Sequence, residues 1–426
     1  MNQGLQRIER LLSYLGDPHK KLNFLHIGGT NGKGSTAAFA ASVLEAAGYR
    51  VGLYTSPYLE KFTNRMAING RDITPEKLVE LVKKVKPLVE KIAADPGCGQ
   101  PTEFEVVTAL ALTYFAWEKP DLVVLEVGLG GRLDATNTVC PLVTALSTIS
   151  LEHTQILGDT VEAVAREKAG IIKNGGVVVT QARGAALEII AAACRQKKVP
   201  LYRLGKEFSV EKTGGNLEGQ TFHYHGLYQQ LPDLRIGLLG DYQVDNAALA
   251  LASLELLTTK GYIVPREAFY QGLAQTSWPG RLEIMQREPL VVVDGAHNIE
   301  AFQNLRAALQ KNFSYRRLIL VLGLLDDKAR EEILAEILPA AAVLILTEPN
   351  SPRAADSSLL KNIAEKTFSG QIYVRKKISE ALRLSLSLAE TPDLVLIAGS
   401  LYLISDARWF LKETPPGKIG TEQSTE

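Results

Sequence analysis

The chain has 426 residues, of which 46% are hydrophobic and 22% charged, and its 47 basic and 47 acidic residues give a formal net charge of zero. This balance excludes the overall positive field by which proteins bind nucleic acid or an anionic membrane surface. No apolar run approaches the length that spans a bilayer, so the expected partners are small molecules.

The length of the chain predicts two or three domains. The three cysteines, Cys98, Cys140 and Cys194, are odd in number and far apart, and they lack the spacing of a metal site. Such a set predicts reduced thiols rather than a disulfide framework. The amino terminus, over residues 4–12, has the pattern of an amphipathic helix and not of a signal peptide. We therefore expect a cytoplasmic protein.

The most informative motif comes next along the chain, where an apolar run stops at a glycine-rich turn over residues 28–34 and a helical pattern follows. This order predicts a strand, a phosphate-binding loop and a helix start. In such a loop Lys33 can reach the outer phosphates of a nucleotide, and Ser35 or Thr36 can face Mg²⁺. Gly34 separates the lysine from the first hydroxyl, which departs from the strict P-loop spelling. The alternative is a glycine-rich turn with a solvated lysine.

Short apolar runs alternate with helical patterns along most of the chain, which predicts an α/β fold with a mostly parallel sheet. In the first part these runs cover residues 122–125, 142–146 and 177–179. The rhythm breaks at residues 204–240, where alternation between glycine-rich turns predicts antiparallel strands, and a long helix is expected over about residues 243–260. It restarts after residue 281 with runs at 290–294, 317–322, 342–346, 372–374 and 394–397.

Two polar side chains stand where apolar runs end. Glu126 closes the run that begins at residue 122, and His153 closes the next stretch. If these strands are parallel neighbours, both side chains emerge at the carboxyl edge of the sheet, beside the phosphate loop, where α/β folds bind ligands. The alternatives are an ordinary strand-end carboxylate and a hydrogen-bonded turn histidine. Lys168, further on, is most simply a lysine in the last turn of a helix, favoured by the helix dipole.

Several sequence blocks, in order, strongly resemble the folylpolyglutamate synthase and dihydrofolate synthase family of Mur-type ligases. They lie at residues 29–35, 54–57, 101–105, 126–137, 167–171, 278–283, 294–298 and 399–403. The similarity covers nearly the whole chain, and the block at residues 126–137 is far more specific than the phosphate loop alone.

This resemblance implies a fold and a reaction. The expected fold is α/β: a P-loop central domain of the Mur-ligase type over residues 1–283, a smaller Rossmann-like glutamate-ligase domain over residues 284–412, and a polar tail over residues 413–426. ATP would phosphorylate a pteroate or folate carboxylate, and the amine of L-glutamate would attack the acyl phosphate to form an amide. The implied cofactors are ATP and Mg²⁺ at two sites, with Lys168 carbamylated, and the implied state is a monomer.

The resemblance also implies roles for individual residues, grouped by ligand. The nucleotide would be held by Thr30, Asn31, Gly32, Lys33, Gly34, Ser35, Thr36, Asn246, Arg281 and Asp294. Metal ligands would be Ser56, Glu126, His153 and Lys168, and substrate contacts Arg132, Asp134, Asn137 and Ser400. Lys33, Lys168, Asp294 and His297 would act in catalysis. Linker solvation and strand capping are the alternative roles for Arg281 and Asp294.

The chain departs from the usual family pattern at Tyr58, Asn64, Glu152, Tyr242 and Ile299. None of these removes a proposed phosphate or metal group, but they bear on the substrate range. Three functions stay open: a folate-type ligase, another Mur-type ligase that joins an amino acid to a different carboxylate, and a nucleotide-driven switch that ligates nothing. The block at residues 126–137 favours the first.

Overall fold

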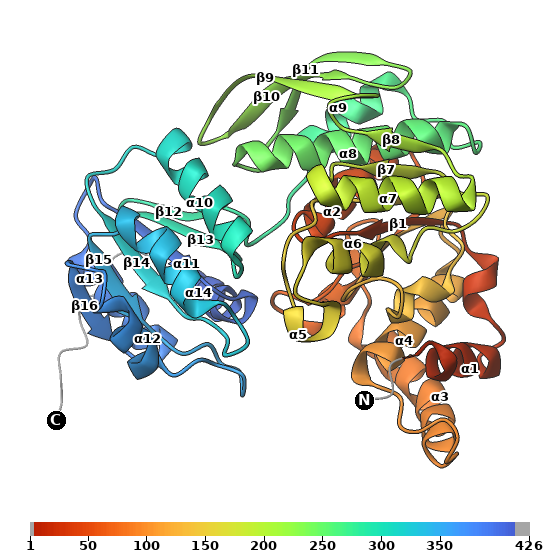
Figure 1. Cartoon of the computed structure of the whole chain (residues 1–426), viewed down its shortest axis with the longest axis horizontal. Coiled ribbons are helices and arrows are strands. Elements are labelled where there is room, and N and C mark those ends of the chain that lie inside the picture. Colours follow the sequence, from red (N-terminus) through yellow and green to blue (C-terminus); the bar gives the residue numbers. More distant parts are fainter. Residues whose placement is uncertain (1–3, 414–426) are drawn as a thin grey trace. The chain divides into compact units, whose positions relative to one another are not determined.

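A computed structural model describes residues 4–413, which pack as two units (Figure 1). The first unit takes in the chain up to Gly214, Gly219–Gly237 and Tyr242–Ser277. The second takes in Gly215–Glu218, Leu238–Asp241 and the chain from Trp278 onward. The domain boundary that the sequence predicts, between residues 283 and 284, stays a proposal. The expected polar tail lies, beyond its first residue, outside the described part of the chain.

An eight-stranded sheet forms the centre of the first unit, in the spatial order β4-β3-β2-β5-β1-β6-β7-β8. Strands β2, β5, β1, β6, β7 and β8 pair in parallel, whereas β3 and β4 form an antiparallel edge. Every residue of β1 and β5 is buried, as in a parallel sheet covered on both faces. The strands are β1 (Phe24–Gly28), β2 (Val51–Tyr54), β3 (Met66–Ile68), β4 (Arg71–Asp72), β5 (Leu122–Glu126), β6 (Val143–Leu146), β7 (Val178–Thr180) and β8 (Leu201–Arg203).

Helices supply the apolar layers around this sheet. The helices α1 (Gln6–Tyr14), α3 (Pro75–Ala93) and α4 (Glu103–Glu118) share one hydrophobic core with Phe24 and Leu125. The helices α6 (Val161–Ala169) and α7 (Gly184–Lys197) share another with Leu146 and Val178. The helix α2 (Lys33–Ala46) contacts β1, β2 and β5, and also α9 (Arg266–Gln275). The remaining helices of this unit are η1 (Pro18–Lys21), η2 (Phe62–Arg65), η3 (Ala135–Thr138), α5 (Thr154–Leu157) and most of α8 (Asp241–Thr258).

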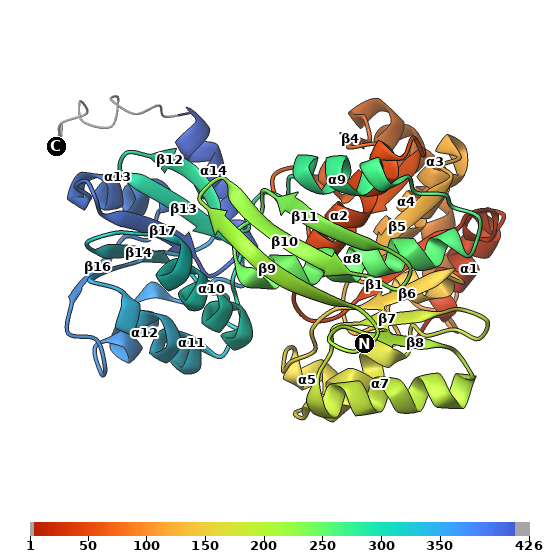
Figure 2. The ribbon, with the colours of Figure 1, turned by 90° about the horizontal axis from the view of Figure 1, so that it is seen from above.

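A three-stranded antiparallel sheet, in the order β11-β10-β9, lies along α8 (Figure 2). Its strands are β9 (Ser209–Asn216), β10 (Gly219–His225) and β11 (Gln230–Ile236). Glu255 of α8 is fully buried and accepts four hydrogen bonds, from the Tyr224 hydroxyl and from the backbone N–H groups of residues 227, 228 and 229. These bonds satisfy a buried carboxylate and fix the β10–β11 turn against the helix.

The second unit is built on a six-stranded sheet in the order β12-β13-β17-β14-β15-β16. All neighbours pair in parallel except β12, which runs antiparallel to β13. Its strands are β12 (Glu283–Arg287), β13 (Leu290–Asp294), β14 (Leu318–Leu322), β15 (Val343–Leu346), β16 (Gln371–Val374) and β17 (Leu394–Ala398). Its helices are α10 (Ile299–Asn312), α11 (Arg330–Ile337), η4 (Leu338–Ala340), α12 (Ser357–Ala364), α13 (Ile378–Leu388) and α14 (Leu401–Glu413).

The predicted fold class is confirmed, since both large sheets are mostly parallel and alternate with helices. Each apolar run singled out in the sequence is a strand, and residues 204–240 contain the antiparallel sheet. The sequence interpretation did not identify the short strands β2, β3, β4, β8 and β12. Among residues 4–413, no helix is both long enough and apolar enough to cross a membrane.

Candidate active site

The glycine-rich turn after β1 forms a tight loop that leads into α2. Gly29 and Gly32 have φ angles of 134° and 91°, a region that favours glycine. A Cβ atom at Gly29 would lie 1.9 Å from Ser147 Oγ, and one at Gly32 would lie 2.2 Å from Asn246 Oδ1. Neither position has room for a side chain, so the backbone at the start of α2 can approach an anion closely.

Polar side chains tie this loop to its surroundings. The Thr30 N–H donates to the carbonyl of Thr148 at 2.6 Å, and the Thr148 hydroxyl donates to the carbonyl of Asn31 at 3.4 Å. Ser35 and Thr36, in the first turn of α2, are buried. Within residues 4–413, Thr36 Oγ1 has no hydrogen-bond partner. A buried hydroxyl in this state, next to a phosphate-type loop, suits a polar ligand or a metal-bound water.

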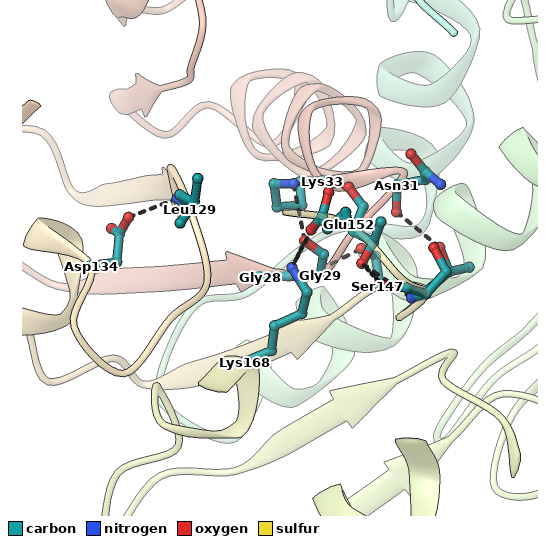
Figure 3. A network of polar contacts seen from close by, with 12 residues as sticks. Gly28, Gly29, Asn31, Lys33, Leu129, Asp134, Ser147, Glu152 and Lys168 are labelled. Atoms are coloured by element: carbon teal, nitrogen blue, oxygen red, sulfur yellow. Dashed lines mark hydrogen bonds and ion pairs between the residues drawn. The ribbon is translucent and has the colours of Figure 1, made fainter. Parts of the chain in front are cut away.

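Two lysines converge on the loop (Figure 3). Lys33 Nζ donates to the carbonyl oxygens of Gly29 and Thr30 at 3.0 and 2.9 Å. Lys168 Nζ donates to the same Gly29 carbonyl at 2.8 Å and to Glu152 Oε1 at 2.6 Å. The sequence places Lys168 in the last turn of a helix, which is confirmed for α6, but the side chain is only 1% exposed. It therefore belongs to the loop and not to the solvated surface.

Burial sets the charge balance of this pair. Burial lowers the pKa of Lys168 to about 8, with Glu152 opposing the shift and the positive charge of Lys33 adding to it. Burial alone would raise the pKa of Glu152, but the attraction of Lys168 and Lys33 outweighs it and brings that pKa to about 2. Glu152 is thus an anion held between two cations, and Lys168 is a lysine that gives up its proton readily.

The carboxyl ends of β2 and β5 bring two predicted metal ligands together. The two strands are parallel neighbours, with Tyr54 opposite Leu125. Just beyond them, the Ser56 N–H donates to Glu126 Oε2 at 3.2 Å, and Glu126 is buried. A carboxylate and a serine at one sheet edge are ligands suited to Mg²⁺.

The expected position of His153 at the end of a strand is wrong. β6 ends at Leu146, and an irregular segment leads to His153, which stands before α5 with a φ of 46°. Because Glu152 faces Lys168 through this segment, the loop after β6 still approaches the phosphate loop. The apolar residues of the segment suggested a longer strand than hydrogen bonding to β7 supports.

Asn246, predicted on the nucleotide side, lies in α8 beside Gly32. Its Oδ1 accepts from Gln181 Nε2 at 3.0 Å, and its Nδ2 donates to Gln243 Oε1 at 3.0 Å. All three amides are buried, and within residues 4–413 Gln181 Oε1 and Gln243 Nε2 have no hydrogen-bond partner. The sequence interpretation missed both glutamines, which are recognisable only from this contact.

A cavity of about 290 Å³ lies beside the loop after β5. Its lining includes Asp134, Arg132, Leu129, Phe104 and Ile156. Asp134 is buried and accepts from the Leu129 N–H at 2.8 Å and from the Thr136 N–H at 2.9 Å. Burial raises the pKa of Asp134, while these hydrogen bonds act in the opposite direction. The cavity therefore combines apolar walls with the buried carboxyl group of Asp134.

Further polar contacts hold the cavity loop in place. Arg132 donates through Nε and Nη2 to Glu167 Oε1 at 3.0 and 2.9 Å. Asn137 Nδ2 donates to the Arg132 carbonyl at 2.8 Å, and Lys173 Nζ donates to the Asn137 carbonyl at 2.9 Å. Asn137 is buried and absent from the cavity lining. The structure thus gives Asn137 a supporting position rather than one facing the cavity.

The lining of the cavity also contains an ion pair that the sequence interpretation missed. Arg7 Nε, from α1, donates to Glu105 Oε2 at 3.0 Å, and both side chains are largely buried. Glu105 also accepts from the Thr102 N–H at 2.7 Å, as the capping box of α4. The pattern Thr102–Glu105 was a recognisable signal for the helix start, but its partner in α1 was not.

In the second unit, predicted residues meet at the carboxyl edge of the sheet. Asp294 closes β13 and accepts from the N–H groups of Leu282 and Ala296, both at 2.8 Å. Burial raises the pKa of Asp294, while Arg281 attracts its charged form. His297 Nδ1 donates to the Gly295 carbonyl at 2.7 Å. Ser400 is buried just after β17, the parallel neighbour of β13.

Lys328 was missed by the sequence interpretation. It follows β14, which pairs with β17, so its loop opens at the same edge as Ser400. Its side chain is only 12% exposed and lies 3.4 Å from Asp327. A mostly buried lysine after a parallel strand is a candidate anion-binding group, but only its place after the apolar run could be seen in the sequence, not its burial.

Within residues 4–413, no three His, Cys, Asp or Glu side chains gather as a complete metal cage. Mg²⁺ keeps several waters and binds through one or two carboxylates together with substrate phosphates. The carboxylate of Glu126 and the hydroxyl oxygens of Ser56 and Thr36 are oxygen groups of the type that Mg²⁺ or its bound waters contact.

Two family models match the chain: the Mur ligase middle domain over residues 27–254 and the Mur ligase glutamate ligase domain over residues 280–401. A dihydrofolate synthase/folylpolyglutamate synthase from Bacillus subtilis is 38% identical over 412 residues, covering 96% of this chain and 95% of that protein. The Mycobacterium tuberculosis folylpolyglutamate synthase, solved with ADP and AMPPCP, has a TM-score of 0.92 and 32% identity, and covers 97% of this chain and 96% of its own. An FPGS–AMPPCP–folate complex has a TM-score of 0.85 and 34% identity, and covers 96% and 95%.

Proposed function

Because the chain belongs to the Mur ligase family, and within it to the folylpolyglutamate and dihydrofolate synthases, we propose that it is an ATP-dependent ligase that adds L-glutamate to a pteroate or folate carboxylate. The products are the acceptor lengthened by one glutamate through an amide bond, ADP and phosphate. The observation that carries the proposal is the convergence of Lys33 and Lys168 on Gly29, in a glycine loop beside the Glu126 edge.

The reaction needs activation because a carboxylate has no adequate leaving group. An oxygen of the acceptor carboxylate attacks the γ-phosphorus of ATP, and the bond to the β-phosphate oxygen breaks, with ADP taking the electron pair. The amine of glutamate then attacks the acyl carbon, loses a proton and expels phosphate. Phosphoryl transfer is promoted mainly by positioning and by neutralisation of charge. Lys33 and the N–H groups at the start of α2 supply both at the outer phosphates.

Mg²⁺ would neutralise charge on the phosphate oxygens, held by Ser56, Glu126 and His153 with the hydroxyls of Ser35 or Thr36 on the phosphate side. Lys168 would join a second metal as a carbamate. An amine reacts with carbon dioxide only when it is unprotonated, and a pKa of about 8 leaves roughly one Lys168 in ten unprotonated at pH 7. The reaction turns a cation into an anion and would release the Glu152 carboxylate from its partner.

The cavity beside β5 is the proposed site of the pterin ring. Flat heterocycles bind between apolar walls with a small number of placed polar groups. Leu129, Phe104 and Ile156 provide such walls, and Asp134 provides a buried acceptor. Arg132 frames the same cavity, held by Glu167. Asn137 supports this loop.

The second unit is proposed to bind glutamate and to act on the acyl phosphate. Ser400 and Lys328 are a hydroxyl and a cation at one sheet edge, as an amino acid with two carboxylates requires. Asp294 and Arg281 are proposed to contact the nucleotide, and His297 to act near the acyl phosphate. Asn246, with Gln181 and Gln243, is proposed to contact the nucleotide from the first unit.

We further propose a monomer that works in the cytoplasm. The three cysteines, Cys98, Cys140 and Cys194, are free thiols, which is typical of a reducing compartment. The neutral charge balance supports small-molecule partners over nucleic acid or membrane.

The deciding experiment measures ATP- and Mg²⁺-dependent phosphate release with L-glutamate, using dihydropteroate or a reduced monoglutamyl folate as the acceptor. Release with both acceptors is expected for a bifunctional enzyme, and release with one assigns the chain to that step. Reactions without glutamate are the control. Release with neither acceptor would overturn the proposal in favour of a Mur-type ligase for another carboxylate. Phosphate release that does not depend on glutamate would indicate a nucleotide-driven switch.

A further inference from the structure

A buried histidine is linked to Asp134, one of the carboxyl groups that line the cavity. His26 is in the middle of β1, is fully buried and takes no part in the chemistry described above. Its Nε2 lies 2.9 Å from the hydroxyl of Thr136, in η3. That hydroxyl in turn donates to Asp134 Oδ1. The three side chains form a line from the centre of the sheet to the cavity wall.

The direction of each hydrogen bond in this line follows from the end that cannot donate. Both oxygens of Asp134 accept from backbone N–H groups, as in a carboxylate that only accepts, so the single hydroxyl proton of Thr136 points to Oδ1. The Thr136 oxygen must then accept from His26, and the proton of the imidazole sits on Nε2. His26 Nδ1 is buried and has no hydrogen-bond partner within residues 4–413, which suits an unprotonated nitrogen. Burial, with a smaller contribution from Lys173, lowers the pKa of His26 to about 3, so the ring is neutral.

We propose that His26 is a positioning residue for the acceptor: acting through Thr136, it fixes the orientation of Asp134 and so sets the affinity for the acceptor ring. This inference rests on the proposed function, because it takes the cavity beside β5 as the acceptor site. The ligand class is a planar heterocycle that presents N–H donors to the carboxylate.

The physical reason is that a hydroxyl is held more firmly when both its donor and its acceptor sides are occupied than when only one is. Without the His26 donor, the Thr136 hydroxyl has no buried partner on one side and can turn away from Asp134. Asp134 would keep its backbone donors at Leu129 and Thr136 but lose the side-chain one. The loss of one such hydrogen bond is worth about tenfold in affinity.

The position of His26 makes a purely structural role separable from this one. His26 lies on β1, which also leads into the phosphate loop at Gly28. A substitution that merely disturbed β1 would weaken the binding of ATP as much as the binding of the acceptor. A substitution that acts through Asp134 would weaken the binding of the acceptor alone.

The test compares His26→Leu, which removes the donor at similar size, with His26→Gln, whose amide N–H can reach the same hydroxyl. Thr136→Val and Thr136→Ser form the matching pair at the second position. Thr113→Val is the control, because Thr113 is also buried but its hydroxyl donates within α4, to the Ala109 carbonyl. KM for the acceptor, KM for ATP and kcat are measured for each variant with whichever folate acceptor the wild-type enzyme uses.

We expect His26→Leu and Thr136→Val to raise the acceptor KM about tenfold, with ATP KM and kcat within about twofold. His26→Gln and Thr136→Ser should restore most of the affinity, and the double variant His26→Leu/Thr136→Val should be no worse than either single one. Equal defects in His26→Leu and His26→Gln, or an ATP KM that rises in step, would overturn the inference.

A second measurement separates this result from the fate of the proposed function. Long-range ¹H–¹⁵N spectra of ring-labelled histidine, assigned with His26→Gln, should show a neutral His26 protonated at Nε2, and Thr136→Val should shift that nitrogen. Protonation at Nδ1 overturns the hydrogen-bond line even in an active enzyme. A wild-type enzyme that turns over neither folate acceptor overturns the proposed function and the acceptor role with it, whatever the spectra show.

Discussion

The ammonium groups of Lys33 and Lys168 share one acceptor, the carbonyl oxygen of Gly29, at 3.0 and 2.8 Å. Two like charges this close are tolerated because Glu152 contacts Lys168 at 2.6 Å and the loop carbonyls bind Lys33. The phosphates of a nucleotide that enters the loop would accept hydrogen bonds from lysine ammonium groups that now bond to backbone carbonyl oxygens. The loop is thus balanced without ligand, and each partner in that balance gives a testable prediction.

Lys33→Ala should lower kcat by about a thousandfold and leave the fold intact, because the lost cation neutralises charge on the transferring phosphate. Glutamate-dependent phosphate release and the thermal unfolding temperature are the measurements. Lys20→Ala is the control, since Lys20 is exposed and its ion pair is with the nearby Asp17. Near-normal release by Lys33→Ala would remove the loop from the mechanism.

Lys168→Ala should be inactive and be partly rescued by a short carboxylic acid such as acetate, which can replace the anion of a carbamate. Lys168→Arg should be inactive without rescue, because a guanidinium stays charged and fills the space. Active wild-type enzyme in ¹³C-bicarbonate should show one carbamate signal that both variants lack. An unmodified Lys168 in fully active enzyme would disprove the carbamate.

Glu152→Gln should change the acid stability of the enzyme. The pKa of Glu152 is about 2 in the folded state, against an ordinary value of 4.5. The ionised Glu152 therefore adds to the free energy of unfolding above about pH 4.5, and this contribution is lost as the pH falls toward 2. The wild type should lose more unfolding free energy over this window than Glu152→Gln does, as followed by urea denaturation at several pH values. Parallel curves for the two proteins would contradict the prediction.

The lowered pKa of His26 predicts a change of stability over a different pH range. Its pKa is about 3 in the folded state, against 6.5 ordinarily, so between these values the unfolded chain binds one more proton. Stability should then rise with pH from about 3 to 6.5, by up to about 1.4 kcal/mol per pH unit from this residue. His26→Gln should flatten the profile by that slope. A wild-type profile as flat as that of the variant would show that His26 ionises freely in the folded protein.

Gly32→Ala should be more damaging than Gly175→Ala. Both glycines have positive φ angles, 91° and 76°, so both variants carry a similar backbone strain of about 1 kcal/mol. Only Gly32 has a close neighbour, Asn246 Oδ1, while a Cβ at Gly175 meets nothing within 4 Å. We expect Gly32→Ala alone to raise the Kd for ATP, measured by calorimetry. Equal ATP affinity in the two variants would mean that Asn246 moves aside freely.

The sequence predicted well what depends on local pattern. The strand, loop and helix around Lys33 follow from glycine spacing and apolar periodicity, and β1 and α2 confirm them. The same holds for the alternating runs that became β13, β14 and β17. The antiparallel strands β9 to β11 were predicted as well, because turn residues and alternation are also local signals.

What the sequence could not supply are contacts between distant segments. The pairing of Arg7 with Glu105, and that of Gln181 with Asn246, depends on how helices pack around the sheet. His153 was placed at a strand end because apolar residues continue past Leu146, although hydrogen bonding to β7 stops there. Short strands such as β4, with two residues, carry too little pattern to be recognised.

The buried Glu255 of α8 has a practical consequence for anyone who redesigns this chain. The helix carries Asn246 against the phosphate loop and, about 14 Å further along its axis, Glu255 beneath the β10–β11 turn. This turn looks like a surface hairpin suited to a tag or a chain break, yet three of its backbone N–H groups are committed to the helix. An insertion there would leave the buried Glu255 carboxylate without its backbone donors. It would thereby destabilise α8, the helix that carries Asn246 on the nucleotide side. Fusion partners belong elsewhere, at a turn such as Gly175, where the surroundings are open.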